Sequence, residues 1–181
     1  VTARCKNVAE GELMVAPLLA EIKETLGSVV YSTNDQELHE VCAALLREHG
    51  MTLAAAESCT GGMIASKLIS VPGISEYFLE GAVTYSNEAK MRRLGVKRET
   101  LEAHTAVSEA VAREMAEGVR ATSGASLGLA TTGIAGPDGG TAERPVGLVY
   151  IALAGAKGTV VRELHLSGNR ERIRNAASLN A

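Results

Sequence analysis

The apolar positions of the chain alternate between helical spacing and short runs that suit β-strands. Between residues 7 and 26, leucines and Ile22 recur near helical spacing and predict a helix, although Pro17 weakens that pattern. Gly27 ends it, and the run SVVYS at 28–32 predicts a short strand. A second amphipathic helix is expected over about 35–49.

Strands and helices alternate from residue 52 onward. Glycines, prolines and Ser108 as a helix N-cap separate the expected elements. The predicted strands are 52–57, 80–86, 126–132, 146–153 and 158–166, and the predicted helices are 62–69, 87–95, 108–122 and a last one from 169 onward. The last two strands suit a hairpin around 154–157. Alternation in the middle with a hairpin near the end predicts a layered α/β domain with a mixed sheet.

Length, charge and composition narrow the class of protein. A chain of 181 residues fits one domain with a small appendage, and the turn near 33–36 is the expected boundary. A net charge of -3 and 3% aromatic residues argue against nucleic acid as the main partner. No apolar run approaches the roughly 20 residues of a membrane span, and no signal-peptide hydrophobic region is seen. The ends of the chain suggest a fragment of a longer protein.

Three widely spaced cysteines form neither a disulfide framework nor a CxxC pattern, so a reducing cytoplasm is the expected location. No HExxH pattern or carboxylate triad indicates a metal, and no cofactor is expected.

The segment AAAESCTGG at 54–62 carries the strongest local signal for chemistry. A strand of small residues leads into a polar turn, and a glycine pair then opens a helix. Ser58 is placed there as a nucleophile, and the N–H groups of Thr60, Gly61, Gly62 and Met63 are candidates for an oxyanion or phosphate cradle. The alternative is an N-cap serine with closely packed glycines.

Cys59 competes with Ser58 as nucleophile, because a thiol at a helix N-terminus can have a lowered pKa. A small buried cysteine is the commoner case.

A second signal is AVTYSNEAK at 82–90, in which Tyr85 ends a strand and Lys90 lies one turn into the next helix. If this strand neighbours the 52–57 strand, both side chains reach Ser58. A serine needs a base, and Lys90 takes that role if burial or nearby cations lower its pKa by about two to three units. Tyr85 would then relay or orient the proton. The alternative is a surface lysine and a half-buried tyrosine.

Two further motifs could contact a ligand, but neither has a pattern that is specific for one. The loop TTGIAGPDGGT at 131–141 matches neither a Walker nor a Rossmann pattern, but its backbone can approach a ligand closely or simply connect two strands. In GNRERIRN, Arg170 and Arg174 share one helix face, where they suit a phosphate or a solvated basic surface.

Taken together, four motifs in order resemble the CinA C-terminal domain family, which includes nicotinamide mononucleotide amidases. The motifs are AESCTGG, GAVTYSNEAK, TTGIAGPDGGTAERPVGLVYIAL and LSGNRERIRNAA. The resemblance implies a three-layer α/β/α fold over residues 36–181. Residues 1–35 would be a linker or the end of a preceding domain.

The resemblance implies hydrolysis of nicotinamide mononucleotide to nicotinic acid mononucleotide and ammonia. The family's nucleophile falls on Ser58, and its tyrosine and lysine fall on Tyr85 and Lys90. A pyridine nucleotide is then the expected partner, and a homodimer is the expected assembly. Chemistry suggests that the glycine-rich loop and Arg170 hold ribose and phosphate. The assigned loop residues are Thr132, Gly133, Gly136, Gly139 and Gly140.

Two alternatives remain open at this point. One is a non-catalytic nucleotide-binding module that regulates an attached domain, and the other is a Ser–Lys amidase for a different small amide. The presence of Ser58, Tyr85 and Lys90 together favours an enzyme, because binding alone needs no nucleophile and base.

Overall fold

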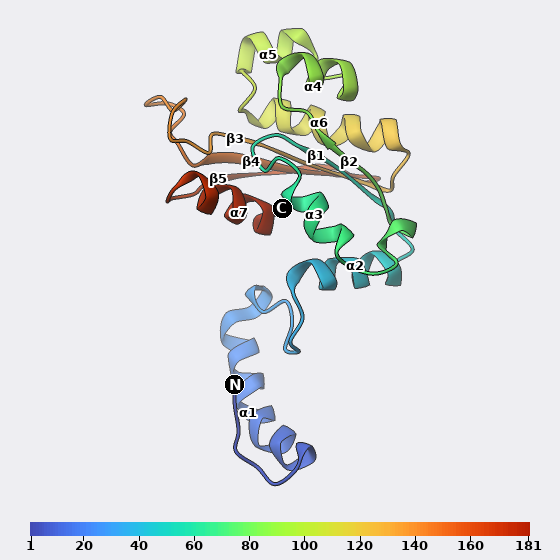
Figure 1. The fold of residues 1–181 in the computed structure, drawn as a ribbon, viewed down its shortest axis with the longest axis vertical. Helices are drawn as coiled ribbons and strands as arrows, with labels where there is room; N and C mark the ends of the chain where they lie inside the picture. Colours follow the sequence, from blue (N-terminus) through green and yellow to red (C-terminus); the bar gives the residue numbers. More distant parts are fainter. The chain divides into compact units, whose positions relative to one another are not determined.

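A five-stranded mixed sheet lies at the centre of the fold (Figure 1). In this computed structural model, which describes residues 1–181 apart from the side chain of Ser28, the strand order is β2-β1-β3-β4-β5. The strands are β1 (Leu53–Glu57), β2 (Phe78–Val83), β3 (Leu127–Gly133), β4 (Leu148–Gly155) and β5 (Gly158–His165). β1 is parallel to both β2 and β3, and the later strands pair antiparallel. The predicted mixed sheet is confirmed.

Helices cover both faces of the sheet. The elements on one face are α4 (Asn87–Leu94), α5 (Arg98–His104) and α6 (Glu109–Ser123), and those on the other are α3 (Met63–Ile69) and α7 (Arg170–Asn180) (Figure 1). Buried side chains form a separate apolar cluster on each face. The expected three-layer α/β/α architecture is therefore confirmed.

Small residues let the layers approach closely. In β1, Ala54 and Ala56 belong to the cluster under α6, whereas Ala55 belongs to the cluster under α3 and α7. This follows from the alternation of side chains along a strand. Glycines in α6 and β3 also allow close packing, because a Cβ atom on Gly118 or Gly128 would collide with a neighbouring backbone carbonyl. The alanine-rich core thus brings β1 close to α6.

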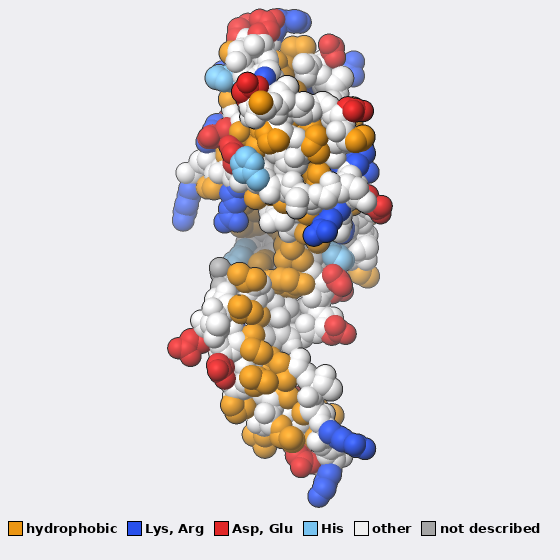
Figure 2. Space-filling model, turned by 90° about the vertical axis from the view of Figure 1, so that its left-hand side faces the viewer, with side chains coloured by type: hydrophobic (Ala, Val, Ile, Leu, Met, Phe, Trp, Pro, Cys, Tyr) orange, Lys and Arg blue, Asp and Glu red, His pale blue; other side chains and the backbone are white. Residues whose placement is uncertain are grey.

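The structure divides into two units, Val1–Val41 and Cys42–Ala181, with the division inside α2 (Leu38–Glu48). The first unit contains α1 (Val8–Leu26), which Asn7 caps and in which no residue is buried. Apolar side chains of α1 are exposed (Figure 2). No helix of the described residues has the length and apolarity needed to cross a membrane.

The structure differs from the predicted elements at residues 28–32 and in two short helices that the sequence did not indicate. The expected strand at 28–32 is wrong: a 3₁₀ turn, η1 (Gly27–Val29), begins there, and Val29 and Tyr31 are exposed. The unpredicted α5 lies between α4 and α6, and a second 3₁₀ turn, η2 (Ile74–Glu76), precedes β2. A segment with a strand-like pattern forms a β-strand only when it pairs with a neighbouring strand, and none of the described strands pairs with residues 28–32.

Candidate active site

The candidate site forms where β1, β2 and β3 end at the same edge of the sheet. Parallel strands bring the residues after their carboxyl ends together. Ser58 directly follows β1, and its N–H donates to Thr131 O of β3 at 3.0 Å. On the other side, the N–H of Thr84 donates to Glu57 O at 2.9 Å. These bonds extend the sheet by one residue and place the segment before Lys90 beside Ser58.

Lys90 is a deeply buried charged side chain of the site, with 1% of its surface exposed. Its Nζ lies 3.2 Å from Ser58 Oγ, 2.8 Å from Thr84 O and 3.3 Å from Tyr85 O. A neutral amine donates two hydrogens and accepts through one lone pair. The two carbonyls can take both hydrogens, which leaves the lone pair for the hydroxyl of Ser58.

Burial lowers the pKa of Lys90 to about 8, because the charged ammonium is disfavoured away from water. The nearby Cys59 thiol opposes this effect when it is ionised. The sequence-based requirement that Lys90 be buried is thus met, and a substantial fraction of the amine is neutral near pH 8.

Cys59 lies next to Ser58 but is poorly suited to be the nucleophile. The residue is 5% exposed, and burial raises the pKa of its thiol to about 11. Backbone N–H groups at Cys59 and Thr60 lower the thiol's pKa only in part. The thiolate is therefore scarce at neutral pH, and Ser58 is the better candidate.

Tyr85 contributes its backbone rather than its phenol to the contacts of Lys90. The side chain is 65% exposed, and its hydroxyl accepts a hydrogen bond from Arg170 Nη2 at 3.3 Å. Only the Tyr85 carbonyl contacts the amine. The predicted relay of a proton through the phenol is not present in this structure, in which Lys90 contacts Ser58 directly.

The buried carboxylate of Glu57 caps the helix that follows the nucleophile. It accepts hydrogen bonds from the N–H groups of Gly62 at 2.9 Å, Ile64 at 3.2 Å and Ala65 at 2.9 Å. A carboxylate stabilises a helix N-terminus in this way, because it satisfies amides that have no partner within the helix. Sequence reasoning missed this role, although a glutamate directly before the turn is the signal for it.

The same turn leaves little of the predicted oxyanion cradle free. The N–H of Gly61 donates to Ser58 O at 3.1 Å, and that of Met63 donates to Thr60 O at 3.3 Å. The Thr60 side chain is fully buried and shares a hydrogen bond of 2.8 Å with Thr131 Oγ1. The cradle prediction is therefore corrected, because the turn's own carbonyls and Glu57 occupy most of its amides.

The first residues of the glycine-rich loop serve packing. Thr132 is buried, and its hydroxyl donates to Ala106 O at 2.7 Å. A Cβ atom on Gly133 would lie 2.6 Å from Val149 Cγ2. The predicted ligand role of the Thr132 side chain is thus replaced by a tether to the segment before α6.

The rest of the loop folds back on itself and is fastened to α7. The carbonyl of Gly136 accepts a hydrogen bond of 2.7 Å from Arg170 Nη1. Gly139 has a positive φ of 87°, which favours glycine, and a Cβ on Gly140 would lie 2.8 Å from Val146 N. Arg170 therefore connects this loop to Tyr85, so that these predicted residues do lie around one edge of the sheet.

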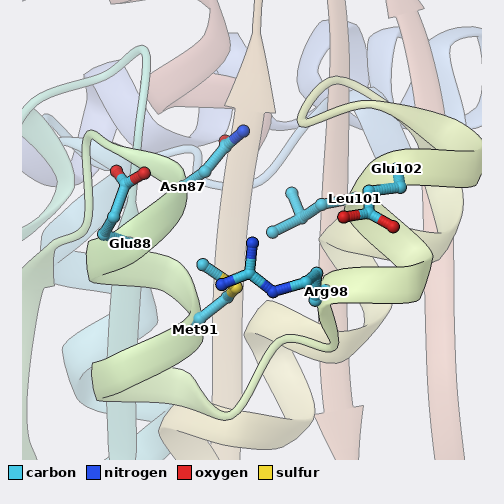
Figure 3. Close-up of a pocket in the computed structure, with 6 residues that line it drawn as sticks. All are labelled: Asn87, Glu88, Met91, Arg98, Leu101 and Glu102. Atoms are coloured by element: carbon cyan, nitrogen blue, oxygen red, sulfur yellow. The ribbon is translucent and has the colours of Figure 1, made fainter.

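A separate pocket lies between α4 and α5 and contains none of the predicted site residues (Figure 3). Its lining residues are Asn87, Glu88, Met91, Arg98, Leu101 and Glu102. In Figure 3 the Arg98 guanidinium extends from α5 toward Met91 of α4. The mixture of charges favours no single class of ligand.

The chain has counterparts among known proteins. The family model of the CinA C-terminal domain matches residues 35–181. The chain belongs to the CinA C-terminal domain family. Solved structures of this family include the competence/damage inducible protein CihA from Agrobacterium tumefaciens, with a TM-score of 0.77 and 41% identity over 80% of this chain and 88% of that one. The competence damage-inducible protein A (ComA) from Klebsiella pneumoniae has a TM-score of 0.77 and 37% identity, over 81% of this chain and 92% of that one.

Relatives in the family extend beyond the matched length. A protein described as competence-damage inducible from Acetivibrio thermocellus is 56% identical over all of this chain, which covers 44% of that relative. A CinA-like protein from Kosmotoga olearia is 50% identical, with the same coverage. The chain thus spans about half the length of the curated relatives it matches.

Proposed function

We propose that the chain is a serine amidohydrolase that converts nicotinamide mononucleotide to nicotinic acid mononucleotide and ammonia. Ser58 is the nucleophile and Lys90 the base. The observation that carries this assignment is the buried Lys90 amine, 3.2 Å from the Ser58 hydroxyl, with a pKa lowered to about 8. A binding module needs no such pair, because a buried lysine beside a serine costs stability without improving affinity.

In the first half of the reaction, Ser58 Oγ attacks the carboxamide carbon while its proton passes to Lys90 Nζ. The Thr84 and Tyr85 carbonyls hold the amine so that its lone pair faces the hydroxyl. The tetrahedral intermediate collapses when its C–N bond breaks, and Lys90 gives the proton to the departing nitrogen. Ammonia leaves, and an ester to Ser58 remains.

In the second half, water attacks the ester carbonyl and Lys90 accepts the proton of the water. Collapse of the second intermediate breaks the C–Oγ bond, and the proton returns to Ser58. The product is a carboxylic acid, and the enzyme regains its starting protonation state. Among the amides of the turn, those of Cys59 and Thr60 contact the Cys59 thiol but no oxygen of the described residues, and we assign them to the oxyanion.

For the remainder of the substrate, we assign the nucleotide to the side of the site formed by Arg170 and the glycine-rich loop. Arg170 is a cation at the carboxyl edge of the sheet, and its Nη1 and Nη2 atoms already contact Gly136 O and Tyr85 Oη. A phosphate can replace the weaker of these contacts with a charge-assisted hydrogen bond.

The test is ammonia release from nicotinamide mononucleotide by the wild type, Ser58→Ala and Cys59→Ala. We expect Ser58→Ala to lose at least about 10³-fold in kcat, because Ser58 supplies the hydroxyl that contacts the Lys90 amine. Cys59→Ala should keep most of the activity, since its thiol is protonated and is not needed. Full activity of Ser58→Ala with loss in Cys59→Ala would reverse the assignment.

Turnover of the mononucleotide, its riboside and free nicotinamide, measured side by side, tests the substrate. A clear preference for the mononucleotide in kcat/KM is expected if a phosphate is recognised. Equal turnover of all three would indicate an amidase for another small amide, and no turnover by the wild type would favour a nucleotide-binding module.

A further inference from the structure

Arg174, one turn after Arg170 in α7, reaches across to the turn that carries the nucleophile. Its Nε donates to Cys59 O at 3.0 Å and its Nη2 donates to Thr60 O at 2.9 Å. The guanidinium thus binds the two carbonyls that directly follow Ser58. This places a cation from the last helix on the backbone of the catalytic turn.

The turn is held from two sides by groups of opposite charge. Glu57 accepts from the amides at the start of α3, and Arg174 donates to the two carbonyls before them. The same turn contains Gly61, whose φ is 61°. A Cβ atom there would lie 3.0 Å from Arg174 Nη2, so the glycine provides both the backbone conformation and the space for the guanidinium.

Holding these peptide groups fixes the position of Ser58 relative to its base. The Ser58 side chain sits at the start of the turn, and the 3.2 Å contact with Lys90 depends on the orientation of that backbone. A misplacement of about 1 Å between reacting groups lowers an enzyme's rate by about 100-fold. A rigid two-point contact therefore affects the rate more than the binding of substrate.

We propose that Arg174 is a positioning residue that holds Ser58 in its reactive orientation through the carbonyls of Cys59 and Thr60. This inference rests on the proposed Ser–Lys mechanism. The planar guanidinium fork can bind two neighbouring carbonyls at once, whereas a lysine ammonium is a single point of charge. The role differs from that of a solvated basic surface or a phosphate ligand, the two alternatives that the sequence left open for this helix face.

The experiment compares Arg174→Lys with Arg172→Lys, a matched change at an exposed arginine two residues away on the same helix. For Arg174→Lys we expect kcat to fall by about 10- to 100-fold with KM for the mononucleotide within about twofold. The midpoint of the pH–rate profile should stay near that of the wild type, because Lys90 remains buried. Arg172→Lys should match the wild type.

A second variant tests the same contact from the side of the turn. Gly61→Ala should lower kcat in the same way, because its methyl group displaces the guanidinium. Gly95→Ala is the control: its φ of 69° imposes a similar backbone strain, but a Cβ there meets nothing within 4 Å. Gly95→Ala should therefore lower the thermal unfolding midpoint without the loss in kcat.

Amide hydrogen exchange of the 58–66 segment gives a readout that needs no activity. Faster exchange there in Arg174→Lys, with unchanged exchange in the sheet, supports the positioning role even if the wild type releases no ammonia and the proposed function fails. Unchanged kcat and exchange in both Arg174→Lys and Gly61→Ala would overturn the inference. A rise in KM for the mononucleotide but not the riboside would identify Arg174 as a phosphate ligand instead.

Discussion

A single buried amine, that of Lys90, links the chemistry of the site to the stability of the fold. Its Nζ contacts two main-chain carbonyls and Ser58, and burial makes its charged form unfavourable. The lowered pKa means that the folded protein binds a proton there less tightly than the unfolded chain does. The same physical cause therefore predicts both a pH–rate profile and a pH–stability profile.

For the rate, the base must be neutral. The kcat/KM of the wild type should therefore rise with pH through a midpoint of about 8 and level off above it. Lys90→Ala should remain inactive even at high pH, because no amine is left to accept the proton of Ser58. Steady-state ammonia release between pH 6 and pH 10 measures both. A midpoint at the ordinary lysine value of 10.5 would contradict the assignment of a buried base.

For stability, the sign follows from proton binding. Between the folded pKa of about 8 and the ordinary value of 10.5, the unfolded chain binds more protons, so stability rises with pH in this window. Relative to Lys90→Met, the free energy of unfolding of the wild type should rise by about 2 kcal/mol from pH 7.5 to pH 10. Urea unfolding of both proteins measures this difference, and a flat or falling difference would be inconsistent with a lowered pKa.

Two threonines on either side of β1, Thr84 directly after β2 and Thr132 in β3, provide a matched comparison. Thr84 Oγ1 is buried and has no hydrogen-bond partner among the described residues, whereas Thr132 Oγ1 donates to Ala106 O. Thr84→Val should leave stability unchanged or raise it, because an unpaired buried hydroxyl is lost. Thr132→Val should lower it by about 1–2 kcal/mol, because a buried carbonyl loses its donor. Equal losses in thermal unfolding of the two variants would show that the Thr84 hydroxyl has a partner in solution.

At the scale of elements, the contact between α4 and α6 reverses a familiar rule. An alanine usually stabilises a helix interior relative to glycine by about 1 kcal/mol. A Cβ on Gly118 of α6 would lie 1.9 Å from Leu94 O of α4. Gly118→Ala should therefore lower the free energy of unfolding by about 1–3 kcal/mol. Chemical denaturation measures it, with Ala121→Gly on the exposed side of the same helix as a control for propensity alone.

Most elements were predictable because their local patterns agree with the tertiary structure. The strand at 52–57 and the helix around 108–122 match β1 and α6 to within a residue or two, since a small-residue run and a capped apolar stripe are strong local signals. The run at 28–32 has an equally good local pattern but no partner strand. In this case tertiary context decides, and a single segment of sequence does not contain it.

The site shows the same division between local and tertiary information. The contact between Ser58 and Lys90 was predictable on the condition that their strands be neighbours, and β1 and β2 do pair. The capping role of Glu57 had a local signal in its position directly before the turn, but the role of Arg174 was not predictable, because it depends on where α7 packs. A side chain that binds the main chain of a distant segment, as Arg174 does, leaves no spacing pattern in a sequence.

On the scale of the whole molecule, every residue assigned to the reaction lies in the second unit. Ser58, Lys90 and the residues that hold them come from elements between β1 and α7. The match to the CinA C-terminal domain also begins only at residue 35. The two units can therefore be tested separately for their contribution to activity.

Removal of residues 1–34 should leave the amidase intact. This deletion removes α1, in which no residue is buried, and keeps α2, whose Leu46 belongs to the core of the second unit. We expect kcat/KM within about twofold of the full chain and a thermal midpoint within a few degrees, because α1 itself contributes no buried residue. Ammonia release and circular dichroism of residues 35–181 measure the two quantities. Loss of activity with a retained fold would mean that the first unit takes part in the site, and loss of the fold itself would mean that α1 stabilises the domain despite its exposure.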